Sequence, residues 1–136
     1  QRMNYESMIQ YVFDEKVWIP AVGQGSIAIE AHGSLDPSIR AQIISKVNDA
    51  NTATEVIAER AFLEKFEGGC SIPVFAHATS DQNGIILRGG IISLDGKQKI
   101  LRERSSHDSK DLGRGLALEV LEVGGQNILK EIRKQI

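Results

Sequence analysis

The sequence lacks most of the features that mark secreted and membrane proteins. Its 136 residues contain one cysteine, Cys70, so the chain cannot form an internal disulfide and suits a reducing compartment. No apolar run is long enough to span a bilayer, and no basic segment followed by an apolar one opens the chain as a signal peptide would. We therefore expect a cytoplasmic protein without a membrane partner.

The sequence also lacks an excess of either charge. It has 16 Lys and Arg against 18 Asp and Glu, a net charge of -2, and a pI of about 5.9. Binding to nucleic acid is therefore not expected as its main task, because that task favours a basic surface. Three histidines, His32, His77 and His107, lack the spacing of metal ligands, so no metal site is predicted.

Residues 36–136 have the pattern of a self-contained domain. Asp36 followed by Pro37 is typical of the start of a helix. Thr52 and Glu55 form a T-x-x-E capping box, which predicts that a second helix begins near Thr52. Two more helices, separated by a pair of glycines, are predicted over 111–123 and 126–136.

Three strand-like runs lie between these helices, over 73–79, 85–94 and 97–105. The short turns between them, one of them Asp95-Gly96, are typical of an antiparallel meander. Gly89-Gly90, inside the middle run, indicates either a bulge or the close approach of a helix. The predicted fold is α+β, with an open three-stranded antiparallel sheet and helices packed on one face.

The first 35 residues do not complete a unit of their own. Residues 3–13 have the apolar spacing of a helix or of its end, and Ile27 to Ile29 look like a buried strand. One helix and one strand cannot bury their apolar faces alone. We expect this segment to be the remainder of something larger, with Trp18 as a packing residue.

Cys70 lies in the most informative segment of the chain. Residues 55–66 have helical spacing, and Gly68 and Gly69 then end the helix cheaply because glycine tolerates positive φ. Pro73 favours an extended backbone just before it. Cys70 is therefore predicted on a short loop between a helix and a strand. Spacing alone leaves two interpretations open, a buried inert thiol or a reactive one.

A second loop, Gly23-Gln24-Gly25, has a weaker signal. Two glycines in G-x-G spacing can approach a phosphate, but that motif needs a third glycine and a following helix. From the pattern alone, a plain turn is favoured over a ligand-binding loop.

One long motif resembles a known family. The run Glu59 to Leu63, followed after three residues by the run Glu67 to Pro73, closely resembles the cofactor-attachment loop of porphobilinogen deaminase (hydroxymethylbilane synthase). The resemblance covers essentially the whole chain. It implies that residues 1–17 are the tail of a second domain, residues 18–35 a crossover segment with the return strand of a first domain, and residues 36–136 the C-terminal cofactor-attachment domain.

The resemblance also implies a cofactor and a reaction. Cys70 would carry a dipyrromethane through a thioether bond, as an anchor that is not turned over. The enzyme would join four porphobilinogen molecules head to tail, release ammonia at each step, and free hydroxymethylbilane with water, in tetrapyrrole (heme) biosynthesis. The implied cofactor-binding residues are Cys70, Gly69, Ser71, Gln24, Gly25 and Ser26.

Two parts of that machinery are not found in this sequence. A polypyrrole chain carries many carboxylates and needs several converging arginines, yet only Arg60 and Lys65 lie near Cys70 in the sequence. The aspartate that the family uses on the pyrrole nitrogens belongs to its first domain, so no catalytic residue is predicted here. The implied partners are porphobilinogen, the growing polypyrrole, and the N-terminal domains of the enzyme, on the same or a separate chain. We expect the isolated chain to be inactive.

The sequence departs from the family pattern at two places near the cysteine. Ser71 stands where many bacterial members have glutamine, and Phe75 stands where a small residue is usual. Both changes concern the packing of the loop and leave the anchoring thiol intact.

A different class of protein has the same order of elements. A helix, three antiparallel strands and a helix also occur in double-stranded RNA-binding domains, which carry a basic cluster at the start of the last helix. Residues 109–114 are mixed in charge, so this non-catalytic alternative is disfavoured. A general interaction module would leave the Glu-Gly-Gly-Cys run unexplained.

Overall fold

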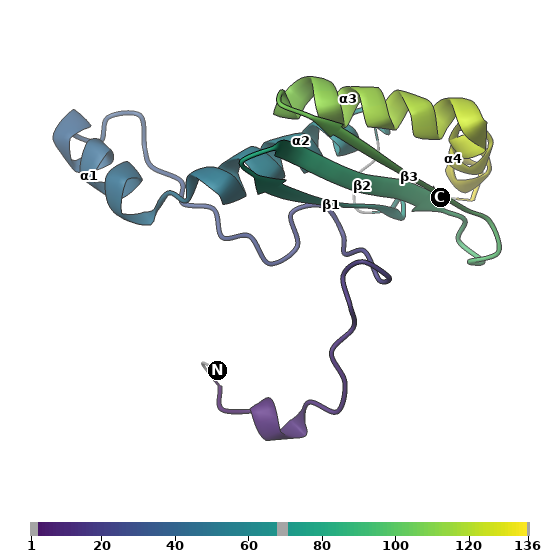
Figure 1. The fold of residues 1–136 in the computed structure, drawn as a ribbon, viewed down its shortest axis with the longest axis horizontal. Coiled ribbons are helices and arrows are strands. Elements are labelled where there is room, and N and C mark those ends of the chain that lie inside the picture. The colour runs from purple at the N-terminus through teal and green to yellow at the C-terminus, as the bar shows by residue number, and fades with distance from the viewer. Residues whose placement is uncertain (1–2, 68–70, 136) are drawn as a thin grey trace.

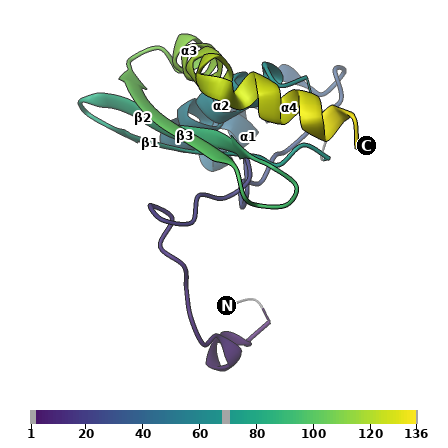
Figure 2. The same cartoon turned by 90° about the vertical axis from the view of Figure 1, so that its right-hand side faces the viewer.

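The computed structural model describes residues 3–67 and 71–135. Its three strands form an antiparallel sheet in the order β1-β2-β3, and α2, α3 and α4 lie over one face of it (Figures 1 and 2). This confirms the predicted α+β fold. The elements in chain order are η1 (Glu6–Met8), α1 (Pro37–Val47), α2 (Ala50–Glu64), β1 (Val74–Asp81), β2 (Gly84–Ile92), β3 (Lys99–Ser106), α3 (Ser109–Val120), η2 (Leu121–Gly125) and α4 (Gln126–Arg133).

The core lies between the sheet and these helices. Phe62 of α2 and Leu87 of β2 are fully buried, as is Leu116 of α3. The strand register runs through Gly89 without a bulge, and a Cβ there would lie 2.9 Å from Cζ of Phe62. Of the two interpretations of this glycine, the close approach of a helix is therefore confirmed. Among the described residues, no helix is both long enough and apolar enough to cross a bilayer.

The first two long helices both begin at an aspartate. Asp36 caps α1 as predicted, and its Oδ1 accepts a hydrogen bond from the Ser38 amide at 2.8 Å. The capping box predicted for the second helix is wrong. Asp49 caps α2 instead, accepting from the amide of Thr52 at 2.7 Å, because an aspartate placed earlier satisfies the first free amides.

These two caps predict a loss of helix in acid. Hydrogen bonds from the Ser38 side chain and then from backbone amides lower the pKa of Asp36, and the Thr52 amide is the main cause that lowers the pKa of Asp49. A carboxyl with a depressed folded pKa stabilises the fold above its unfolded pKa and loses that effect as pH falls through the folded value. We expect far-UV circular dichroism to show fraying of α1 and α2 below about pH 4.

A matched variant separates the caps from the other carboxylates. Asparagine caps a helix about as well as aspartate but does not titrate. The double variant Asp36→Asn, Asp49→Asn should keep its helix signal at neutral pH and lose less of it in acid. Identical acid titrations of the two proteins would contradict the prediction.

The N-terminal segment differs from the prediction. Where a helix over 3–13 was expected, the described part contains only the short 3-10 turn η1, and the strand expected at Ile27 to Ile29 is not formed. Ile27 is 92% exposed, and Trp18, expected to be packed, is 66% exposed. Apolar spacing predicts a face to be buried but does not supply the surface that buries it. Figure 1 shows the first part of this segment, drawn in purple, lying away from the sheet.

The remaining expectations are confirmed with small shifts. Each of the three strands begins and ends one or two residues from its predicted position. Gly124, with φ of +122°, marks the kink between α3 and α4 that the glycine pair predicted. α1 lies at one end of the molecule, away from the core (Figure 1).

Candidate functional site

The segment before α1 docks on the free edge of β1. The Ala76 amide donates to the carbonyl of Pro20 at 3.2 Å, and Ala21 forms an isolated antiparallel bridge with Phe75. Ile19, at 9% exposure, is buried beside this contact. The tertiary structure thus brings a segment far upstream of the cysteine onto the strand that follows it.

Two carboxylates of α2, one helical turn apart, accept the next amides of that edge. Glu59 is only 5% exposed; its Oε1 accepts from the Ala78 amide at 2.9 Å and its Oε2 accepts from the Gly23 amide at 2.7 Å. Glu55 accepts from both the amide and the hydroxyl of Ser80, each at 2.7 Å. Glu55 therefore binds only the edge of β1, whereas Glu59 links that edge to the loop at residues 23–26.

That loop is built from two overlapping turns. The Gln24 amide donates to the carbonyl of Ala21 at 3.0 Å, and the Ser26 amide donates to the carbonyl of Gly23 at 3.1 Å. Gly23 and Gly25 have φ of +68° and +85°, which only glycine adopts without strain. Gln24 is exposed. The backbone of this loop is therefore a turn with an exposed Gln24 side chain, and the ligand contacts that the resemblance implies for it stay a prediction.

The cysteine loop is bounded by a helix and a strand, as predicted. α2 ends at Glu64, and β1 begins at Val74. Glu67 and Ser71, on either side of the cysteine, are exposed, and Ile72 is buried at 7% exposure. Gly69 and Cys70 lie outside the described residues, so their predicted roles remain predictions.

Arg133 of α4 contacts the chain just after the C-terminal end of α2. Its Nη2 donates to the carbonyl of Phe66 at 3.0 Å and lies 3.7 Å from Oε2 of Glu67. Sequence reasoning missed this residue, because the contact spans 67 positions and no local pattern marks it.

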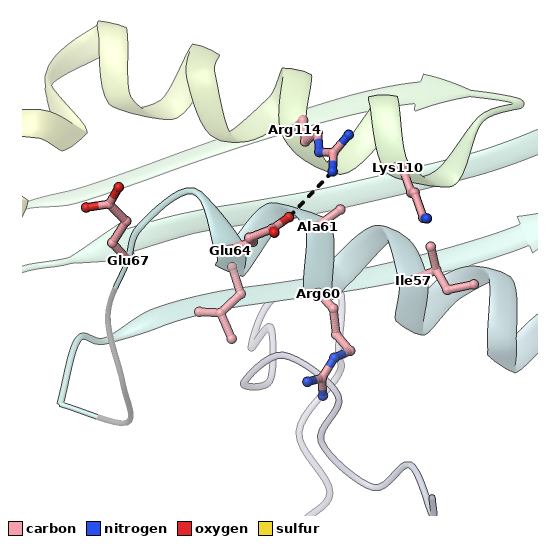
Figure 3. A pocket seen from close by; sticks show the side chains of 8 residues that line it. Ile57, Arg60, Ala61, Glu64, Glu67, Lys110 and Arg114 are labelled. Carbon is pink, nitrogen blue, oxygen red and sulfur yellow. Dashed lines mark ion pairs between the residues drawn. The ribbon is translucent and has the colours of Figure 1, made fainter. Parts of the chain in front are cut away.

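A shallow cavity of about 700 Å³ lies between α2 and the start of α3 (Figure 3). It adds Lys110 and Arg114 to the cations that the sequence had indicated. They do not converge, however: Arg114 lies 3.8 Å from the carboxylate of Glu64, and Arg60 points away from both (Figure 3). The lining residues are Ile57, Arg60, Ala61, Leu63, Glu64, Glu67, Lys110 and Arg114.

No group of three or more His, Cys, Asp or Glu among residues 3–67 and 71–135 is arranged to hold a metal ion.

Fold and site define a class: a small α+β domain that presents a helix-to-strand glycine loop, with a second glycine turn docked on its sheet edge. Comparison with known proteins gives the family. The family model described as "Porphobilinogen deaminase, C-terminal domain" matches residues 53–122, from α2 through the cysteine loop and the sheet to η2. The chain belongs to the porphobilinogen deaminase family.

Curated relatives with the same family name align with nearly the whole chain. Porphobilinogen deaminases from Cytophaga hutchinsonii and Desulfosudis oleivorans are 46% and 43% identical over 98% of it, and one from Carboxydothermus hydrogenoformans is 38% identical over 98%. The chain spans only 43% to 44% of the length of these relatives. The alternative of a double-stranded RNA-binding module is not favoured by these matches.

Proposed function

We propose that this chain is the cofactor-carrying part of a porphobilinogen deaminase, a transferase that converts four porphobilinogen molecules into hydroxymethylbilane with release of ammonia. The observation that carries the proposal is the loop at residues 65–73. It contains the single cysteine, lies within the matched region, and has exposed residues on both sides. The full-length enzyme would act in the cytoplasm, where a lone thiol stays reduced.

The residues around the thiol fit an attached dipyrromethane. The exposed flanks at Glu67 and Ser71 leave room for a group outside the core, and a thiolate is the form of cysteine that makes a thioether. The bound group supplies the primer to which pyrrole units are added. Cys70 holds that primer in the site and so makes each addition a local event. Gln24, with the backbone of Gly25 and Ser26, would contact the pyrrole chain.

The charges of the chain support a division of labour with further domains. The pyrrole chain carries many carboxylates and needs converging cations to bind it. However, Arg114 is paired with Glu64, Arg133 is paired with Glu67, and Arg60 points away from Arg114. We assign charge neutralisation and the catalytic aspartate to the N-terminal domains. Residues 1–17 would be the tail of the second domain, residues 18–35 the crossover and return strand of the first, and residues 36–136 the attachment domain.

Exposed apolar side chains support the same division. Met8, Val12 and Ile27 are 73%, 76% and 92% exposed, which is unusual for large apolar groups that gather in one segment. The N-terminal domains would cover them, on the same chain or on a separate one.

The test compares the isolated chain with the full-length enzyme. We expect the isolated chain to release no hydroxymethylbilane, because it lacks the converging arginines and the catalytic aspartate. The full-length enzyme should turn over porphobilinogen, and its denatured intact mass should exceed the sequence mass by one dipyrromethane. Adding the N-terminal domains to the isolated chain should restore turnover. A full-length protein with neither the added mass nor turnover would overturn the proposal.

A further inference from the structure

Glu59 is a buried carboxylate that the anchoring chemistry does not use. The charge lies on α2, the helix that leads into the cysteine loop, and its side chain is almost completely removed from water. A buried carboxylate is costly unless its oxygens accept hydrogen bonds. The hydrogen-bond partners of Glu59 therefore indicate its structural role.

Each oxygen of Glu59 serves a different part of the molecule. Oε1 accepts from the Ala78 amide at 2.9 Å and lies 3.5 Å from Nδ1 of His77, both on β1. Oε2 accepts from the Gly23 amide at 2.7 Å. One side chain thus joins the helix before the cysteine, the strand after it, and the turn that carries Gln24.

Glu55 shows that a glutamate of α2 can bind the edge of β1 without also binding the glycine turn. It lies one helical turn earlier, and both of its hydrogen bonds go to Ser80. The two glutamates share a helix, a charge and a strand edge. They differ in burial, since Glu55 is only half-buried, and in that Glu59 alone of the two binds the glycine turn.

We propose that Glu59 is a positioning residue that fixes the turn at residues 23–26 against α2 and β1, the two elements that flank the cysteine loop. Resting on the proposed function, this means that Glu59 holds the groups that contact the pyrrole chain against the helix and the strand that flank the cysteine loop. Glu59 touches neither cofactor nor substrate. It acts through Gly23, whose amide it orients, and so through Gln24.

A carboxylate suits this role because it has two equivalent acceptors. Glutamine has one oxygen and one amino group, so in Glu59→Gln a donor would face either the Gly23 or the Ala78 amide. Glu59→Asp keeps both oxygens but shortens the side chain by one methylene, so it can reach one donor but not both.

The experiment uses the full-length enzyme with Glu59→Gln, Glu59→Asp and the matched control Glu55→Gln. We expect Glu59→Gln to retain the dipyrromethane mass but to lower kcat/KM about tenfold or more, since a hydrogen bond to a charged group is lost. Amide hydrogen exchange should become faster in the peptide covering residues 20–26. Glu59→Asp should have an intermediate effect and provides the test if Glu59→Gln does not fold.

The control variant and a double variant distinguish positioning from general stability. Glu55→Gln should alter exchange near Ser80 and leave kcat/KM near the wild-type value. Because Glu59 acts through Gln24, the double variant Glu59→Gln, Gln24→Ala should lose no more activity than the worse of the two single variants.

Two outcomes would overturn the inference while wild-type turnover stands. One is that Glu59→Gln and Glu55→Gln lower activity and melting temperature equally. The other is that exchange at residues 20–26 is unchanged in Glu59→Gln and Glu59→Asp. A wild-type enzyme without cofactor or turnover would instead overturn the proposed function, whereas the exchange measurement would still report whether Glu59 holds the turn.

Discussion

Replacing Cys70 with alanine in the full-length enzyme is expected to abolish both the added dipyrromethane mass and the formation of hydroxymethylbilane. Alanine has no sulfur with which to form the thioether, so no primer is held in the site. Holding reactants in place accounts for rate factors of about 10⁵ or more, and we expect activity to fall below detection. Intact mass spectrometry and a porphobilinogen turnover assay measure the two effects separately.

Cys70→Ser is the matched control for packing. Serine keeps the shape of the side chain, but its hydroxyl is a far weaker nucleophile than a thiolate at neutral pH. This variant should therefore fold as the wild type does and be as inactive as Cys70→Ala. Retention of the added mass in either variant would show that the cofactor is attached elsewhere and would remove the main support for the proposed function.

Replacing Gly113 with alanine is expected to destabilise the domain strongly. Gly113 lies where α3 crosses α2, and a Cβ there would be 2.2 Å from the carbonyl oxygen of Ala58 and 2.7 Å from the amide nitrogen of Phe62. These are backbone atoms of a packed helix, so the two helices would have to separate. Overpacking of this kind costs about 3 kcal/mol in the free energy of unfolding. Urea unfolding of the chain, followed by circular dichroism, measures the loss.

Gly115, two positions later on the same helix, is the control. The nearest atoms to a Cβ there belong to the guanidinium end of Arg104, at 3.1 Å, and that flexible group can shift. Gly115→Ala should therefore be neutral or should stabilise the chain by up to about 1 kcal/mol through helix propensity. Equal stabilities for the two alanine variants would show that the α2–α3 crossing is looser than the structure has it.

The consequences of Gly113→Ala should extend beyond stability. α2 carries Glu59 and leads into the cysteine loop, so a shift of this helix moves both features.

The order of the elements could be predicted from the sequence because its determinants are local. The turn signal Asp95-Gly96 lies between two strands of the meander, and Gly124 bends the chain between α3 and α4. Asp36 starts α1 through bonds to amides two and three residues away. The start of α2, which the sequence analysis misplaced, also depends on a local contact, the one between Asp49 and the Thr52 amide three residues on.

The cysteine loop and the family were also readable from the sequence. A lone thiol after two glycines, within a long ordered motif, needs no tertiary contact to be recognised. The same kind of local pattern misled at the N-terminus. Apolar spacing predicted a buried helix over 3–13 and a packed Trp18, but burial depends on a facing surface that spacing cannot supply.

Only the tertiary structure decided what holds the two loops together. Glu59 reaches 19 residues forward to Ala78 and 36 residues back to Gly23, and no local pattern marks either contact. The need for glycine at position 113 likewise depends on the packing of α3 against α2. Such roles arise from contacts between distant segments. Local propensity says which element a residue joins, but the packing of the whole chain decides which backbone groups lie opposite its side chain.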